Sequence, residues 1–208
     1  MSAAGGEFAL IDWIRAQAAG HPRLRIGIGD DAAAYHMPAE SECLVAADML
    51  LEGVHFTIPP ATPEQVGYKA LAVNLSDMAA MAGRPLASFC SIALPRPYGQ
   101  EFPRRLHAGL QQLAGTFETV VAGGDTNIWD GPLVINVAIL GEAVGNGPVR
   151  RSGAQAGDWI MVTGRLGGSL DGRHLCFSPR VNEALALSAA RPLHAMIDIS
   201  DGLAADLH

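Results

Sequence analysis

The chain has 208 residues, of which 49% are hydrophobic and 17% charged, a composition typical of a folded globular protein. Its formal net charge is −7 and Lys69 is its only lysine, so we expect no nucleic acid partner, which would need clusters of Lys and Arg. No apolar run approaches the roughly 18 residues of a membrane span. Together with three scattered cysteines, this favours a cytoplasmic protein with reduced thiols and no membrane association.

The first quarter of the chain predicts a helix, a turn and a strand. Apolar residues at helical spacing predict an amphipathic helix over residues 6–19. A glycine-hinged turn at residues 27–31 then presents Asp30 and Asp31 side by side. Adjacent carboxylates repel and raise each other's pKa, so this pair favours a divalent cation. The apolar run 43–47 predicts a strand that ends at Asp48.

The next segment predicts a loop and a long helix. Residues 51–60 contain Gly and Pro, predict a loop, and carry His55. Thr62 as N-cap, with Pro at the first helical position, predicts a helix from there to about residue 82. Asn74 and Asp77 lie on one side of it. This pair either borders the buried face and hydrogen-bonds a neighbouring loop, or Asp77 faces the other carboxylates.

The remainder of the first domain alternates strands and one helix. Strands are predicted over residues 87–94, 119–122 and 133–140, and a helix over 102–117. The second of these strands runs into Gly123, Gly124 and Asp125, where the glycines would let the backbone approach a ligand closely.

Residues 141–157 are rich in Gly, Pro and Arg, which predicts a domain boundary. The pattern then restarts, with strands predicted over 159–163 and 194–197, a helix over 183–190, and Asp198 and Asp201 close to the end. We therefore expect a first domain over residues 1–145 and an incomplete second domain over 146–208.

Two common phosphate-binding motifs do not fit. The glycine turn matches a loose dinucleotide-binding pattern, but Asp30 and Asp31 would stand against the pyrophosphate and Pro38 interrupts the required helix. A Walker loop needs a Gly-Lys-Ser/Thr ending, whereas Lys69 lies inside a predicted helix. If ATP is bound, metal ions and arginine must neutralise its phosphates. The recurring acids predict several Mg²⁺ ions at a phosphoryl-transfer site.

Seven blocks of the sequence, in order, closely resemble the thiamine-monophosphate kinase family of the aminoimidazole ribonucleotide synthetase-like superfamily. They are residues 6–8, 27–32, 48–56, 68–81, 123–126, 151–154 and 197–203. The resemblance implies an α/β (α+β) fold of two domains, the first of which binds ATP and Mg²⁺ and forms a homodimer. It also implies direct in-line transfer of the γ-phosphoryl group of ATP to thiamine monophosphate, giving thiamine diphosphate.

The same resemblance implies roles for individual residues. Seven acids would bind or orient Mg²⁺: Asp30, Asp31, Asp48, Asp77, Asp125, Asp198 and Asp201. The nucleotide would be contacted by Gly124, Asp125, Arg151 and Ser200. His55 would touch the thiamine phosphate.

Three departures from the family pattern keep other functions open. Ala46-Ala47 replaces hydroxyl residues, the segment 167–179 is shorter than usual, and an acidic segment and an aromatic residue that follow in the family are not found before His208. One alternative is therefore a non-catalytic or partly active Mg-nucleotide-binding dimerisation module. Another is a related ATP-dependent enzyme that acts on a different small phosphorylated substrate.

Overall fold

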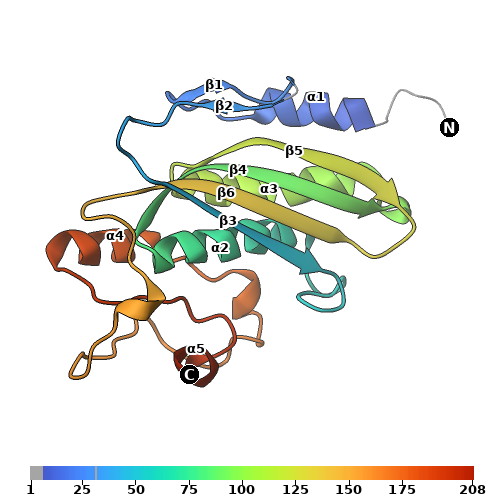
Figure 1. Ribbon diagram of the computed structural model, residues 1–208. Helices are drawn as coiled ribbons and strands as arrows, with labels where there is room; N and C mark the ends of the chain where they lie inside the picture. Colours follow the sequence, from blue (N-terminus) through green and yellow to red (C-terminus); the bar gives the residue numbers. More distant parts are fainter. Residues whose placement is uncertain (1–6, 31) are drawn as a thin grey trace.

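The computed structural model describes residues 7–30 and 32–208, so Asp31 lies outside the described residues. Its centre is a four-stranded sheet in the order β3-β6-β4-β5 (Figure 1). The strands are β3 (Cys43–Leu51), β4 (Gly83–Pro95), β5 (Val120–Trp129) and β6 (Val134–Ala143). Strand β6 is antiparallel to both of its neighbours, whereas β4 and β5 are parallel. The predicted mixed α/β class is confirmed.

Two long helices cover one face of this sheet. Helix α2 (Pro63–Ala80) begins at a capping box in which Thr62 and Gln65 exchange hydrogen bonds between side chain and backbone, as the Thr-Pro start predicts. Helix α3 (Glu101–Thr116) connects β4 to β5. Their apolar stripes bury the main core against the inward-facing residues of the strands. The largest fully buried side chains include Leu71, Leu75, Leu106, Leu110, Ile135 and Ile139.

The opposite face of the sheet is covered only in part. Strands β1 (Leu24–Ile26) and β2 (Ala34–Tyr35) lie over a small second core of Ala87, Val120 and Ala122. Helix α1 (Glu7–Gln17) corresponds to the helix predicted over residues 6–19. Towards β3 the face is open, because alternation along that strand leaves Val45 70% and Met49 55% exposed.

The C-terminal part of the chain packs on the outer side of α2 (Figure 1). It contains η3 (Arg151–Gly153), η4 (Arg173–Leu175), α4 (Val181–Ala190) and α5 (Leu203–Leu207). The strands predicted over 159–163 and 194–197 are wrong, since neither segment is extended into a sheet. A strand needs a ladder of backbone hydrogen bonds, and within the described residues neither segment forms one. Trp159 is 91% exposed, and the N–H of Met196 donates to the carbonyl of Arg150 without the bond continuing into a ladder. The domain boundary near residue 145 stays a prediction.

No helix of the described chain is long and apolar enough to cross a membrane.

Helices α2 and α3 approach so closely that two glycines are required between them. A Cβ atom at Gly67 would lie 1.9 Å from the backbone oxygen of Leu106, and one at Gly109 would lie 2.0 Å from that of Glu64. Each glycine thus faces a carbonyl of the other helix, and the backbone cannot move away without disturbing the core. This contact fixes the distance between α2 and α3.

We expect Gly67→Ala to lower the free energy of unfolding by about 1–3 kcal/mol, because the added methyl group meets backbone and not a movable side chain. Helix propensity alone would predict stabilisation of up to about 1 kcal/mol. Gly115, in α3 with nothing within 4 Å of a Cβ atom, is the matched control. Chemical denaturation of both variants should give opposite signs; stabilisation by Gly67→Ala would contradict the close contact.

Candidate functional site

Three of the predicted acids come together between the sheet and the C-terminal segment. Strand β3 does not end at Asp48, as predicted, but continues to Leu51, so Asp48 lies within it. The register places Asp48 opposite the buried Val137, on the side that faces α2. Asp77, on the last turns of α2, and Asp198, in the C-terminal coil, complete the group.

The electrostatics of this acid cluster, Asp48, Asp77 and Asp198, follow from its partial burial. Burial, followed by the charges of Asp48 and Asp198, raises the pKa of Asp77 to about 6, and the positive charge of Arg151 opposes this shift. Burial also raises the pKa of Asp48, with the charge of Asp198 as the next cause. The three carboxylates therefore share one electrostatic environment, and a cation placed among them would relieve their repulsion.

A serine that the sequence analysis did not single out ties the cluster together. The hydroxyl of Ser76 donates a hydrogen bond to Asp198 Oδ2 at 3.2 Å, joining α2 to the C-terminal coil. Ser76 is adjacent in sequence to Asp77, which is the one hint that it belongs to the site. Sequence spacing alone does not show that the chain around Asp198 packs against this helix. Asn74 is fully buried and donates to the carbonyl of Ala70 in its own helix at 3.0 Å, so it does not bind a neighbouring loop.

A cleft of about 470 Å³ opens beside the acid cluster. Asp77 and Arg151 lie on its wall together with Ser152. The rest of its lining is mostly apolar: Leu44, Val45, Ala46, Met78, Ala80, Met81, Val149 and Met196, with Arg150. A cleft with an apolar floor, an arginine and a carboxylate can take a ligand that is part aromatic and part anionic.

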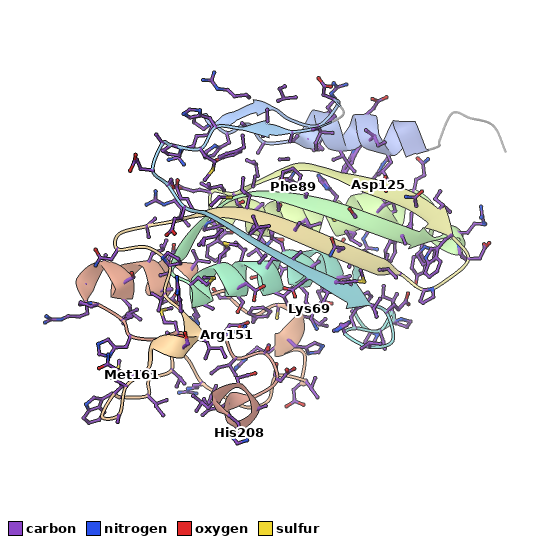
Figure 2. All side chains as sticks on the ribbon, viewed as in Figure 1. Lys69, Phe89, Asp125, Arg151, Met161 and His208 are labelled. Atoms are coloured by element: carbon purple, nitrogen blue, oxygen red, sulfur yellow. The ribbon has the colours of Figure 1, made fainter. Side chains whose placement is uncertain are left out.

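Asp125 lies away from this cluster. Asp48 pairs with Val137, Val137 with Cys90, and Cys90 with Gly124, so three strand spacings of about 4.8 Å separate the two sites. Because side chains alternate, Asp125, which pairs with the exposed Ser91, lies on the opposite face of the sheet from Asp48. It accepts a hydrogen bond from Asn127 at 2.8 Å. Figure 2 labels Asp125 on β5 and Arg151 below the sheet.

The glycine pair lies within strand β5, where Gly124 makes a close approach to the neighbouring strand. A Cβ atom at Gly124 would lie 1.9 Å from the carbonyl oxygen of Cys90. The glycine therefore allows β5 to pair with β4, and the segment 123–125 is not a turn. Whether Gly124 also contacts a nucleotide stays a prediction.

The remaining predicted residues lie in two other places. Asp30 forms a β-bridge with Ile28 in the N-terminal segment, next to β1. The backbone N–H groups of Ser200, Asp201 and Gly202 all donate to Asp206 Oδ2, at 3.1, 3.2 and 3.0 Å. The turn that follows Asp198 is therefore built around a carboxylate of its own helix, α5.

His55 is held firmly in the loop between β3 and α2. The imidazole Nδ1 of His55 accepts a hydrogen bond from the backbone N–H of Leu51 at 2.9 Å. The backbone N–H of His55 in turn donates to the carbonyl of Leu51. Its carbonyl oxygen accepts a hydrogen bond of 2.6 Å from Lys69 Nζ, on α2. Because Nδ1 accepts, the proton of the neutral imidazole lies on Nε2, which is left as a donor.

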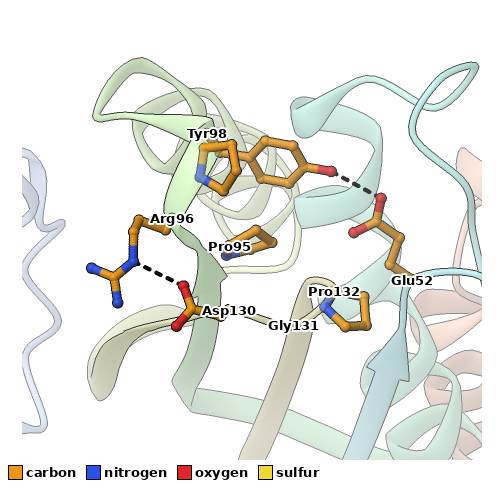
Figure 3. Close-up of a pocket in the computed structure, with 8 residues that line it drawn as sticks. Glu52, Pro95, Arg96, Tyr98, Asp130, Gly131 and Pro132 are labelled. Carbon is orange, nitrogen blue, oxygen red and sulfur yellow. Dashed lines mark hydrogen bonds and ion pairs between the residues drawn. The ribbon is translucent and has the colours of Figure 1, made fainter.

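A larger cleft, of about 610 Å³, contains none of the predicted site residues (Figure 3). Its polar groups are satisfied by each other: Tyr98 donates to Glu52 at 2.9 Å, and Arg96 forms an ion pair with Asp130 at 2.9 Å. Glu52 also accepts from the backbone of Leu133 at 2.9 Å. These bonds anchor the His55 loop to the sheet, so we assign this cleft a structural role.

The acid cluster fits Mg²⁺ when a phosphate ligand is present. Within the described residues, no group of three or more His, Cys, Asp or Glu side chains could hold a metal ion by itself. Mg²⁺ is commonly held by one or two carboxylates with waters and substrate phosphates completing its shell. Asp48 and Asp77, which lie close enough to shift each other's pKa, supply the oxygen ligands for that arrangement.

Comparison with known proteins gives consistent results. Residues 29–143 match the family described as AIR synthase related protein, N-terminal domain. The chain is 38% identical to thiamine-monophosphate kinase from Rhodopirellula baltica, over 97% of this chain and 65% of that protein. Its fold is similar to the crystal structure of thiamine-monophosphate kinase from Stenotrophomonas maltophilia K279a, with 37% identity, a TM-score of 0.79, and coverage of 97% and 70%.

A further solved structure carries ligands. It is AaThiL complexed with AMPPCP and TMP, which is 30% identical with a TM-score of 0.72, over 96% of this chain and 67% of that one. The chain thus spans about two thirds of the length of these relatives, and just under that for the Rhodopirellula protein.

The raised pKa of Asp77 predicts a pH-dependent stability in the absence of metal. The Asp77 carboxyl stays protonated up to about pH 6 in the folded chain but only to about pH 3.8 in the unfolded chain. Because the unfolded chain releases this proton first, the free energy of unfolding falls as the pH rises between these two values. Asp77→Asn should therefore raise the thermal midpoint at pH 7 by about 2–4 °C, as expected for about 1 kcal/mol after allowance for solvent screening.

Thermal unfolding in EDTA at pH 7 and pH 4.5 measures this effect, which should largely disappear at the lower pH. Asp12→Asn, an exposed position on α1, serves as the control. A destabilised Asp77→Asn chain at pH 7 would show that Asp77 is not repelled by its neighbours.

Proposed function

Because the chain belongs to the thiamine-monophosphate kinase family, we propose that it phosphorylates thiamine monophosphate to thiamine diphosphate with ATP and Mg²⁺. The observation that supports this most is the convergence of Asp48, Asp77 and Asp198 beside Arg151, at a cleft of about 470 Å³. The solved structure of a relative, AaThiL complexed with AMPPCP and TMP, also supports this substrate pair.

In this proposal the reaction is a direct in-line phosphoryl transfer with no covalent enzyme intermediate. Bound Mg²⁺ would neutralise the charge that develops on the phosphoryl oxygens. Asp48 and Asp77 would hold the ions, with the negative charge of Asp198 beside them, and Arg151 would place a fixed positive charge beside the nucleotide. Catalysis then consists of positioning and charge neutralisation, which requires no side-chain nucleophile.

We further propose that the chain forms a homodimer through the open face of the sheet. This face carries exposed apolar residues on β3, and Asp125 lies on the same side. Exposed apolar patches on a stable domain commonly mark interaction sites. A second copy packed here would cover Val45 and Met49 and enclose Asp125 at the contact.

A second candidate function is binding of Mg-nucleotide without turnover. It is favoured by Ala46-Ala47, which stands directly before Asp48 and lacks the hydroxyls usual in the family. A turnover assay and a binding measurement on the same preparation separate the two candidates.

We expect Asp48→Asn to lower kcat for thiamine diphosphate formation by about 100-fold or more, the usual effect of removing a group that stabilises the transition state. Steady-state assay with ATP, thiamine monophosphate and Mg²⁺ measures it, with the exposed Asp171→Asn as control. Calorimetry should show that ATP binding weakens strongly without Mg²⁺, because unscreened carboxylates repel its phosphates. Full activity of Asp48→Asn, or equal ATP affinity without metal, would overturn the metal assignment.

For the homodimer, Met49→Glu should shift the chain to a monomer in sedimentation velocity, because a charge on the open face would be buried at the contact. Val54→Glu is the matched control, since Val54 is 72% exposed but lies in the loop after β3. The unaltered chain sedimenting as a monomer at micromolar concentration would rule out this dimer.

A further inference from the structure

Lys69, the only lysine of the chain, occupies an unusual position. It lies on α2, half-buried, and its ammonium group donates to the carbonyl oxygen of His55 at 2.6 Å. It forms no ion pair with a carboxylate in the part of the chain that the structure describes. A neutral carbonyl satisfies one of its three donors and none of its charge.

Such a cation is costly to keep without an anion. Partial burial withdraws Lys69 from water, and this burial lowers its pKa. Other basic residues have carboxylate partners: Arg23 pairs with the buried Glu142, and Arg105 pairs with Glu64 nearer the surface. A half-buried ammonium with two free donors is suited to a phosphate, which lysine binds as a compact point charge.

The position of Lys69 relative to the acid cluster supports a phosphate in this place. Lys69 lies eight residues before Asp77 on α2, about 12 Å along the helix, and Val73 and Ser76 lie between them on the same partly exposed side. Strand β3 gives a similar spacing between the acid cluster and His55. Asp48 and Leu51 are about 10 Å apart along the strand, and the backbone of Leu51 hydrogen-bonds the His55 side chain. Figure 2 labels Lys69 beneath the sheet, towards the C-terminal segment.

The neighbouring histidine has a complementary donor. With Nδ1 accepting from Leu51, His55 has its free N–H on Nε2. The hydrogen bond from Lys69 to the backbone carbonyl of His55 thus holds together two side chains, Lys69 and His55, that can both donate to an anion. The acid cluster repels phosphate unless metal is bound, whereas this corner attracts it directly.

We propose that Lys69 binds the phosphate of the acceptor, at the end of the site away from the acid cluster. This assignment rests on the proposed kinase function and extends it by giving the acceptor phosphate a binding residue of its own. The same contact would make the enzyme select a phosphorylated acceptor over the corresponding alcohol. The hydrogen bond to His55 holds Lys69 in place for this role.

Isothermal titration of the full chain with thiamine monophosphate and with thiamine tests the proposal. Lys69→Met removes both the charge and the donor, whereas Lys69→Gln removes the charge but keeps a donor for His55. Both variants should bind thiamine monophosphate about 10- to 100-fold more weakly, the usual effect of losing one charge-assisted contact, with affinity for thiamine and for Mg·ATP unchanged. Arg25→Met, at an exposed position on β1, is the control.

The outcomes separate the two levels of the proposal. Equal loss of affinity for thiamine and thiamine monophosphate, or no loss for either, would overturn the role of Lys69 while leaving the kinase function in place. Failure of the unaltered chain to bind thiamine monophosphate would overturn the proposed function itself. If Lys69→Met does not fold, as judged by circular dichroism, the result with Lys69→Gln decides.

Discussion

The packing of helix α2 against the sheet is the contact on which both the core and the candidate site depend. One side of this helix buries Leu71 and Leu75 in the main core, and Gly67 lets α3 approach within backbone contact. The other side presents Lys69 to the His55 loop, and Ser76 and Asp77 to the C-terminal segment. A small change in the height or rotation of α2 would therefore move a cation and a carboxylate of the site together.

The acid cluster shows how function opposes stability in this fold. Asp48 and Asp77 are partly buried beside each other, and burial and mutual repulsion both disfavour their charged forms. Sites that must bind metal and phosphate commonly retain such unfavourable arrangements, and the surrounding core offsets the cost. Here the offset comes from the packed layer of α2 and α3 and from the Ser76 bond to Asp198.

Much of the fold could be predicted from the sequence, because apolar periodicity and helix caps are local signals. The Thr62 cap and the stripe of α3 gave correct helices. The strand predicted over residues 159–163 is wrong, because an apolar run indicates that these side chains favour burial but not whether a neighbouring strand is available for pairing. The glycines before Asp125 indicate a close backbone approach but not its partner, and the structure shows the backbone of Cys90 on β4 against Gly124.

For the site, the sequence supplied the residue types but not their distances. That Asp48, Asp77 and Asp198 meet depends on how the C-terminal coil returns to α2, which no local pattern records. That Asp125 lies on the other face depends on strand order and register. The sequence shows that Lys69 is the only lysine, whereas its contact with the carbonyl of His55 depends on how the loop after β3 folds back onto α2.

The walls of the site differ in how their backbone is held. Asp48 and Asp77 lie on a paired strand and a packed helix, whereas Asp198 lies in coil fixed to α2 by one side-chain hydrogen bond. Amide groups of α2 and β6 should therefore exchange with solvent only through global unfolding, and those near Asp198 through much smaller local openings. Ligand binding would then be recorded mainly as slower exchange in the coil, so most of the entropy lost on binding arises in one wall.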